Sequence, residues 1–148
     1  MTLEVKIVRL AHATDLPIPA RQTLQSAGFD VSAAVNTPVT LEPMQIALTP
    51  TGFAMEIPEG YEAQIRPRSG LSLKHGITCV NAVGTIDADF RGELRVPMIN
   101  LGSAPFTIER GMRIAQMIVS KLPDVRLVEA TTLTETTRSA GGFGHTGL

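Results

Sequence analysis

The stretch ITCVNAVGTIDADFRGELRVPMI, residues 77–99, decides the fold class of this chain. It contains the short apolar runs ITCV, GTID and ELRVPMI, which are separated by Asn, Asp and Gly residues. Runs of this length between turn-forming residues are typical of β-strands. The sequence therefore predicts consecutive strands here, with DADFRG (residues 87–92) as a hairpin or a tight loop.

The same pattern continues on both sides of this stretch. Apolar residues alternate with polar ones at residues 3–7, 46–48, 53–57 and 61–65, and the runs FTI, RIAQMIV and VRLV follow toward the C-terminus. Turn-forming residues interrupt the runs about every ten residues, a spacing typical of an all-β sandwich or barrel.

One short helix is expected over SGLSLKHG, residues 69–76. Ser69 is its predicted N-cap, Leu73 is predicted to face inward, and Gly76 is predicted to end it. No longer segment has helical periodicity, so the predicted chain is all-β apart from this helix.

Composition limits the possible partners. The chain has 148 residues and a formal net charge of −1, which predicts one domain without a strong electrostatic field. We therefore expect no nucleic-acid partner and no membrane partner, and no apolar run reaches the roughly 18 residues that span a bilayer. The single cysteine, Cys79, is predicted to be a buried thiol outside any internal disulfide, which fits a cytoplasmic location.

The C-terminal region differs in composition from the rest. Residues 131–137, TTLTETT, are polar and threonine-rich, which is consistent with a linker. Residues 1–130 are therefore predicted to form the folded body and residues 131–148 a C-terminal arm. The arm ends in RSAGGFGHTGL, whose glycines lose much conformational entropy on ordering. Two interpretations remain for it, a disordered tail or a flap that orders over a ligand.

IRPRSGLS, residues 65–72, is a candidate anion site. Pro67 favours extended backbone before it, and Arg68 then stands beside Ser69 and Gly70 at the expected start of the helix. A guanidinium can bind phosphate through two parallel hydrogen bonds, and a helix start offers free N–H groups. The alternative is a strand-to-helix turn with a solvated arginine.

Asp87 stands at the end of a predicted strand, within GTIDADFRG. Asp87, Asp89 and Gly92 partly match a calcium loop, but Arg91 and Met98 stand where oxygen ligands are needed. Two interpretations of Asp87 remain, an acidic turn or a general base in a pocket.

Polar residues also occur in other predicted strands. RIAQMIV places Arg113 and Gln116 in an apolar strand, and Asp30 follows a glycine bend at a strand start. For Arg113 by itself, a buried structural arginine paired with a carboxylate is the better interpretation, and for Asp30 by itself a turn residue is. The three histidines show no metal-ligand spacing.

Five stretches, taken in order, closely resemble the five motifs of the trimeric dUTP pyrophosphatases (dUTPases). They are AGFD (27–30), RPRSG (66–70), GTIDADFRGE (84–93), RIAQ (113–116) and R-x-x-GGFGHTG (138–147). The resemblance implies an all-β fold, a jelly-roll-type β-barrel, that forms a homotrimer with sites shared between subunits. It also implies Mg²⁺-assisted hydrolysis of dUTP to dUMP and pyrophosphate, which lowers dUTP and supplies dUMP for dTMP synthesis.

The resemblance also implies roles for particular residues. Asp87 resembles the base that deprotonates a water for attack on the α-phosphorus, and Asp30 resembles a carboxylate that holds Mg²⁺ through water. Arg113 resembles the structural partner of a nearby carboxylate. The implied substrate-binding residues are Arg68, Ser69, Gly70, Asn81, Gly84, Thr85, Ile86, Asp87, Phe90, Arg95, Gln116, Arg138, Phe143 and Gly144.

These residues divide by the part of the substrate that they would contact. Asn81 and the backbone of residues 84–87 resemble the uracil clamp, and Phe143 resembles the ring that covers the base. The implied phosphate contacts are Arg68, Ser69, Gly70, Gln116 and Arg138. Arg95, on the following strand, is a weaker candidate for a substrate contact.

Three residues depart from the family's pattern. Phe90 replaces the usual tyrosine of the third motif, and its ring can still fill the space under the deoxyribose and reject a 2′-hydroxyl without the phenol contact. Ser139 replaces a glycine after Arg138, so a positive φ there would strain Ser139 or bend the arm differently. His145 replaces the commoner serine.

Two alternative functions are kept. A dCTP deaminase shares the fold and would convert dCTP to dUTP without releasing pyrophosphate, but the RIAQ and GGFG stretches favour the pyrophosphatase. A non-catalytic nucleotide-binding or scaffolding module on the same barrel would need no base, whereas Asp87 is retained beside a full set of phosphate-binding residues.

Overall fold

The computed structural model describes residues 2–142 of the chain. Its strands are β1 (Lys6–Arg9), β2 (Phe29–Ser32), β3 (Val39–Leu41), β4 (Ile46–Pro50), β5 (Phe53–Glu56), β6 (Tyr61–Pro67), β7 (Ile77–Cys79), β8 (Gly84–Ile86), β9 (Arg95–Asn100), β10 (Phe106–Ile108) and β11 (Arg113–Lys121). A 3-10 helix, η1 (Ala11–Ala13), follows β1, and α1 (Ser69–His75) is the one α-helix of the described residues. The predicted all-β fold is confirmed.

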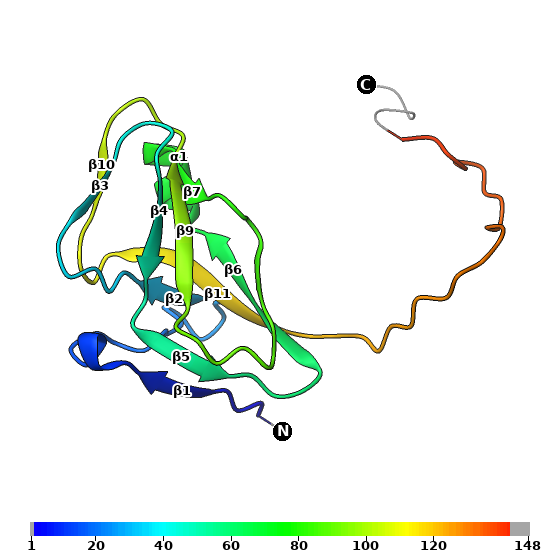
Figure 1. The fold of residues 1–148 in the computed structure, drawn as a ribbon, viewed down its shortest axis with the longest axis horizontal. Helices are drawn as coiled ribbons and strands as arrows, with labels where there is room; N and C mark the ends of the chain where they lie inside the picture. The colour runs from blue at the N-terminus through cyan, green and yellow to red at the C-terminus, as the bar shows by residue number, and fades with distance from the viewer. Residues whose placement is uncertain (1, 143–148) are drawn as a thin grey trace.

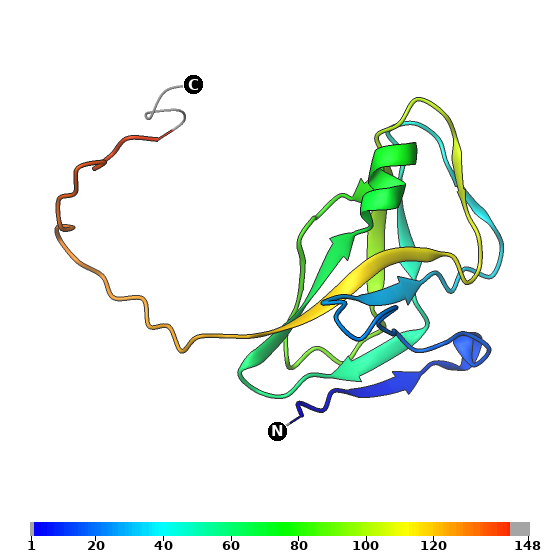
Figure 2. The same cartoon turned by 180° about the vertical axis from the view of Figure 1, so that it is seen from behind.

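The strands pair antiparallel throughout, in the orders β2-β11-β6-β8, β4-β9-β7, β1-β5 and β10-β3. Both views of the molecule place α1 at the end of the body opposite to β1 and β5 (Figure 1, Figure 2). Since β6 runs directly into α1, the predicted phosphate residues lie at that end of the four-stranded sheet.

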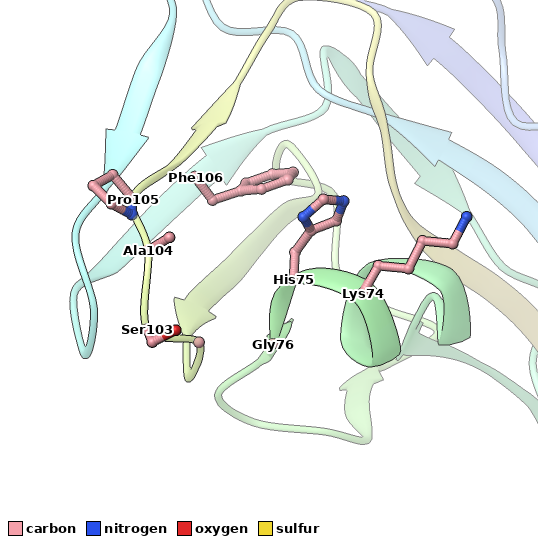
Figure 3. A pocket seen from close by; sticks show the side chains of 8 residues that line it. Lys74, His75, Gly76, Ser103, Ala104, Pro105 and Phe106 are labelled. Carbon is pink, nitrogen blue, oxygen red and sulfur yellow. The ribbon is translucent and has the colours of Figure 1, made fainter.

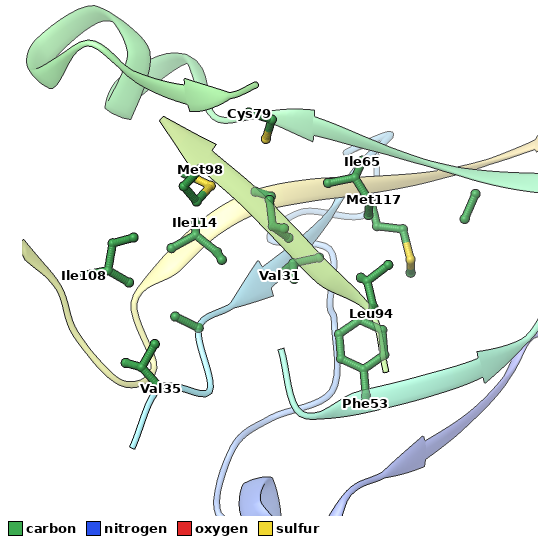
Figure 4. Close-up of a cluster of buried hydrophobic side chains, with 14 of the residues drawn as sticks. Val31, Val35, Phe53, Ile65, Cys79, Leu94, Met98, Ile108, Ile114 and Met117 are labelled. Atoms are coloured by element: carbon green, nitrogen blue, oxygen red, sulfur yellow. The ribbon is translucent and has the colours of Figure 1, made fainter. Parts of the chain in front are cut away.

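An aliphatic core fills the space between the sheets. Figure 4 shows Val31, Ile65, Met98 and Ile114 gathered from β2, β6, β9 and β11. Burying one such side chain contributes roughly 1.5–3 kcal/mol. Cys79 lies in this core, which confirms the predicted buried thiol, and burial raises its pKa to about 11. The thiol is therefore protonated and unreactive at neutral pH.

The four-stranded sheet has an apolar inner face and a polar outer face. On β6, Ala63 and Ile65 are buried, whereas Glu62, Gln64 and Arg66 project outward, because successive residues of a strand point to opposite faces. Arg66 Nη2 donates to Gln64 Oε1 at 2.7 Å, and Gln64 Nε2 donates to Glu62 Oε1 at 2.7 Å. The outer face thus carries a continuous row of polar groups.

The structure decides between the two alternatives for DADFRG, and it shows that one strand prediction is wrong. β8 pairs with β6, whereas β9 pairs with β4 and β7, so DADFRG connects two different sheets and is a tight turn rather than a hairpin. The run VRLV, residues 125–128, forms no strand, because no strand of the described chain pairs with it.

The short helix is confirmed, but two details of its prediction are wrong. Arg68, and not Ser69, occupies the N-cap position, and no side chain caps the helix. Leu71 packs against the core, whereas Leu73 is 89% exposed, since residues two apart lie on opposite sides of a helix. Gly76 ends the helix as predicted, with a left-handed φ of 68°.

Residues 122–142 contain no strand or helix, and Figure 1 shows them running away from the body after β11. The division of the chain at residue 130 stays a prediction. Within residues 2–142, no helix has the length and apolar character needed to cross a bilayer.

We predict that Gly76→Ala destabilises the protein far more than Gly60→Ala. Both glycines have positive φ, of 68° and 79°, so each alanine introduces backbone strain of about 1 kcal/mol or more. At Gly76 an added Cβ would also lie 2.4 Å from the Gly102 backbone nitrogen, whereas nothing lies within 4 Å at Gly60. Urea unfolding measures both; equal losses of unfolding free energy would contradict this explanation.

Candidate active site

One buried carboxylate organises the first group of predicted site residues. Asp30, on β2, is 6% exposed. Arg113 Nη1 donates to its Oδ2 at 2.9 Å, and Gln116 Nε2 donates to its Oδ1 at 3.3 Å. The predicted pairing of Arg113 with a carboxylate is confirmed, although the Arg113 side chain is 46% exposed rather than buried.

Arg68 joins the same group from the end of β6. Its Nε lies 3.7 Å from Asp30 Oδ1, and its Nη1 donates to the Arg113 carbonyl at 3.0 Å. Ser69 and Gly70 follow it and are exposed. The structure therefore brings Asp30, Arg68 and Gln116 together, with Ser69 and Gly70 next in the chain.

The group carries excess positive charge. Arg68 and Arg113 share the single carboxylate of Asp30, and Arg66 is the direct pairing partner of Gln116 on the same face of the sheet. Two guanidinium groups that share one carboxylate leave an excess of positive charge, which favours a bound anion, and arginine is well suited to phosphate.

Residues 2–142 contain no group of three or more His, Cys, Asp or Glu side chains that could hold a metal ion. Asp30 could still hold a metal-bound water, because its Oδ1 has contacts of 3.3 Å and 3.7 Å and retains accepting capacity. Mg²⁺ is often bound by one or two carboxylates together with substrate phosphates and water. The residues present fit an ion held in that way.

Asp87 begins the turn that follows β8. The Phe90 backbone N–H donates to the Asp87 carbonyl at 3.2 Å, and the Asp87 side chain is exposed. Within residues 2–142 its carboxylate has no hydrogen-bond or ion-pair partner, so it is free to accept a proton from water. In a single chain Asp87 lies in an exposed turn, and its place in a pocket stays a prediction.

Two hollows of the described chain lie elsewhere. One of about 210 Å³ is formed by the C-terminal end of α1 and residues 102–106, where Phe106 lies beside His75 (Figure 3). It contains none of the predicted site residues.

β8 lies at the edge of the four-stranded sheet, because it pairs with β6 on one side and with no described strand on the other. Backbone N–H and C=O groups of alternate residues of β8 therefore point away from the sheet toward the unpaired side. The Asn81 side-chain nitrogen lies 3.2 Å from the position that a Cβ on Gly84 would occupy. Asn81 and β8 thus form a second group beside Asp87.

Phe90 and Arg95 flank this second group. The Phe90 ring is 44% exposed and lies over Gly92, where an added Cβ would be 2.7 Å from its Cζ. Arg95 is paired with Glu93, from Nη2 to Oε2 at 3.1 Å. The expectation that Arg95 contacts substrate stays a prediction.

The two groups lie far apart in one chain. Ile86 pairs with Ala63, so Asp87 lies beyond that point on the sheet, whereas Arg68 follows the other end of β6. At about 3.3 Å per residue, the backbone positions of Asp87 and Arg68 are on the order of 15–20 Å apart.

Arg138 is the predicted site residue of the arm that lies within the described residues. Arg138 Nε donates to the Gly141 carbonyl at 2.8 Å, and Ser139 has a positive φ of 42°. The left-handed conformation considered for this position is thus present in a residue with a Cβ, at a cost of roughly 1 kcal/mol. The predicted residues Phe143 and Gly144, and the departure at His145, lie outside the described residues.

Sequence reasoning missed the row of Glu62, Gln64 and Arg66 and the hydrogen bonds of Arg91 within the turn. The period-two alternation of β6 was the available signal for the row. Nothing in the sequence pattern showed where the Arg91 guanidinium would bind.

Comparison with known proteins agrees with the family resemblance of the sequence motifs. The dUTPase family model matches residues 14–147. The deoxyuridine 5′-triphosphate nucleotidohydrolase of Rhizobium leguminosarum bv. trifolii is 53% identical over 146 residues, which cover 97% of this chain and 94% of that protein. Staphylococcus bacteriophage 80alpha dUTPase, solved with dUPNHPP, is 26% identical with a TM-score of 0.88, covering 99% of this chain and 100% of that chain.

A further solved structure shares the fold. It is a mutant dUTPase from phage phi11 of S. aureus, described with a coordinated structural Mg(II) ion. The TM-score is 0.77 at 23% identity, over 87% of this chain and 97% of that chain.

We predict that Asp30→Asn destabilises the protein by about 1–3 kcal/mol, because it removes the buried charge that Arg113 and Arg68 share. Asp15→Asn is the matched control, since it breaks the exposed pair with Arg110, which solvent screens, and should therefore cost clearly less. Urea unfolding of both variants measures the difference. Equal effects would show that Asp30 does not organise this group.

Proposed function

The chain belongs to the dUTPase family, and from this premise we propose how its residues hydrolyse dUTP to dUMP and pyrophosphate. The enzyme is a dUTP diphosphatase. We propose a homotrimer in which Asp87 of one subunit acts on a triphosphate held by the cationic group of another. The separation of about 15–20 Å between Asp87 and Arg68 in one chain is the observation that carries this arrangement.

Cyclic association explains how the two groups would meet. In a head-to-tail ring, one surface of each subunit faces a different surface of the next, so distant groups of one chain become neighbours. The turn carries Asp87 and Asp89 against the single cation Arg91, whereas the other end of the sheet carries Arg66, Arg68 and Arg113. These opposite charges favour that docking and leave space between them for nucleotide and metal.

Asp87 acts as the general base of the proposed reaction. Its exposed carboxylate accepts a proton from a water, and that water attacks the α-phosphorus as pyrophosphate leaves. The absence of a protein partner for this carboxylate within residues 2–142 supports the role, because no ion pair must first be broken.

The cationic group binds the phosphates. Arg68, Ser69, Gly70 and Gln116 contact them from the body, and Arg138 adds a charge when the arm closes. Bound Mg²⁺ would neutralise charge that develops on the phosphate oxygens, with Asp30 holding one of its waters. Arg113 orients the Asp30 carboxylate through its hydrogen bond. Phosphoryl transfer requires mainly such positioning and charge stabilisation.

The edge of β8 reads the base. Uracil pairs with backbone groups of residues 84–87 and with Asn81, and a tight backbone slot excludes the methyl group of thymine. Cytosine would leave buried polar groups mispaired, which discriminates strongly. Phe90 lies against the deoxyribose, and Phe143 and Gly144 cover the uracil as the arm closes and expels water.

We also propose a cytoplasmic location. The reaction consumes a free nucleotide, and the single cysteine, Cys79, forms no disulfide. Neither a nucleic-acid partner nor a membrane partner is part of the proposal.

We predict that Asp87→Asn keeps the fold and dUTP binding but lowers kcat by about 10²–10⁴-fold, because the general base is lost. Asp89→Asn, in the same exposed turn, is the matched control and should retain most turnover. Pyrophosphate release from dUTP with Mg²⁺ measures both. A kcat like that of the wild type in Asp87→Asn would contradict the mechanism.

We predict that each active site takes its general base, Asp87, and its closing arm from different subunits. Two variants test this, one with Asp87→Asn and an intact arm, the other with Asp87 but ending before Arg138. Each homotrimer should be nearly inactive. After the two variants are unfolded, mixed equally and refolded, about a quarter of the active sites should contain both an intact Asp87 and an intact arm.

The mixed trimers are confirmed by mass before the assay. If base and arm came from one chain, no mixed trimer would contain a complete site. Failure to regain activity would therefore reject the shared site.

A further inference from the structure

We propose that Arg91 is a positioning residue of this site, whose guanidinium fixes the turn that presents Asp87 and Phe90. The inference rests on the proposed function, which assigns Asp87 to the water and Phe90 to the sugar. Arg91 itself touches neither, and acts through the backbone of the turn.

The contacts of Arg91 lie inside the turn. Its Nη1 donates to the Ala88 carbonyl at 2.6 Å and to the Phe90 carbonyl at 3.0 Å. One charged nitrogen thus bridges two peptide groups and fixes their relative orientation. Hydrogen bonds from a charged donor are about twice as strong as neutral ones.

The turn has little else to hold it. Its backbone bond from Phe90 N–H to the Asp87 carbonyl is long, at 3.2 Å. Ala88 packs against the core, but Asp87 and Phe90 are exposed, and no side-chain hydrogen bond of either occurs within the described chain. The directions of both side chains therefore follow the backbone that Arg91 holds.

An ionic role for Arg91 is not supported by its surroundings. Within residues 2–142 it forms no salt bridge. Glu56 has its pKa lowered mainly by the hydrogen bond from Lys6 at 2.9 Å, and Arg91 is the smallest of the causes. The carbonyl groups of the turn are thus the principal partners of this guanidinium.

Gly92 links the same turn to the position of the Phe90 ring. A Cβ on Gly92 would lie 2.7 Å from Phe90 Cζ and 3.0 Å from Cε2, so Gly92→Ala must displace the ring. The ring end is partly exposed and can move, so this variant shifts Phe90 while leaving the donors of Arg91 in place. Gly92→Ala therefore tests the position of the Phe90 ring separately from the position of the Asp87 carboxylate.

The test compares Arg91→Met, which removes the donors, with Arg91→Lys, which keeps one charged nitrogen able to bridge both carbonyls. Arg9→Met, at the exposed last residue of β1, is the control for the same charge change. In Arg91→Met we expect kcat on dUTP to fall about 10–100-fold, since misplacement by about 1 Å can cost 10²-fold. Arg91→Lys should recover most of kcat, and Arg9→Met should match the wild type.

Sugar selectivity provides the readout that a purely structural role would not move. The ratio of kcat/KM for dUTP to kcat/KM for UTP should decrease in Arg91→Met and in Gly92→Ala. By contrast, kcat on dUTP should fall mainly in Arg91→Met. Amide hydrogen exchange at Phe90 should accelerate in Arg91→Met and stay unchanged in Arg9→Met, which tests the turn independently of activity.

Unchanged kcat, selectivity and Phe90 exchange in Arg91→Met would overturn the inference, and so would equal losses in Arg9→Met. If the wild type released no pyrophosphate, or Asp87→Asn stayed fully active, the proposed function would fail instead. Accelerated exchange in Arg91→Met would still support the role of Arg91 in the turn.

Discussion

The arrangement around Asp30 depends on a β-bulge in β11, where the pairing with β2 shifts register between Arg113 and Ala115. In a regular strand, residues three apart point to opposite faces, so Arg113 and Gln116 could not both reach Asp30. The extra residue turns Arg113 to the face that carries Gln116. A nearly buried carboxylate thereby gains a guanidinium on one oxygen and an amide on the other.

The two halves of the proposed site are stabilised differently, and this difference suits their roles. The Asp30 group is held by charged hydrogen bonds beside a packed core, so its donors are oriented before a phosphate arrives. Asp87 stands on an exposed turn held by backbone and Arg91 contacts, with its carboxylate unengaged in the described chain. A base must exchange protons with water, whereas a phosphate site benefits from fixed charges.

The edge strand β8 exposes the protein to unwanted association, and its proposed role explains why this edge is present. Unpaired backbone groups at a sheet edge invite association with other chains, and proteins commonly keep such edges short. β8 has 3 residues, and its outer edge offers the donors and acceptors that a pyrimidine edge requires. In the predicted arm, the glycines and the positive φ at Ser139 suit the closing that we propose for it.

The sequence by itself determined the all-β class, the helix end at Gly76, the buried Cys79 and the motifs that contain Asp30, Arg68, Asp87 and Gln116. The all-β class, the helix end and the buried cysteine follow from period-two alternation and local residue chemistry, which need no knowledge of distant contacts, whereas the motifs follow from the resemblance to the dUTPase family. It failed for VRLV and for the face of Leu73, because pairing and burial depend on which segments meet. Only the tertiary structure decided that the bulge joins Arg113 and Gln116 at Asp30 and that Asp87 lies far from Arg68, since both depend on strand register between residues distant in the chain.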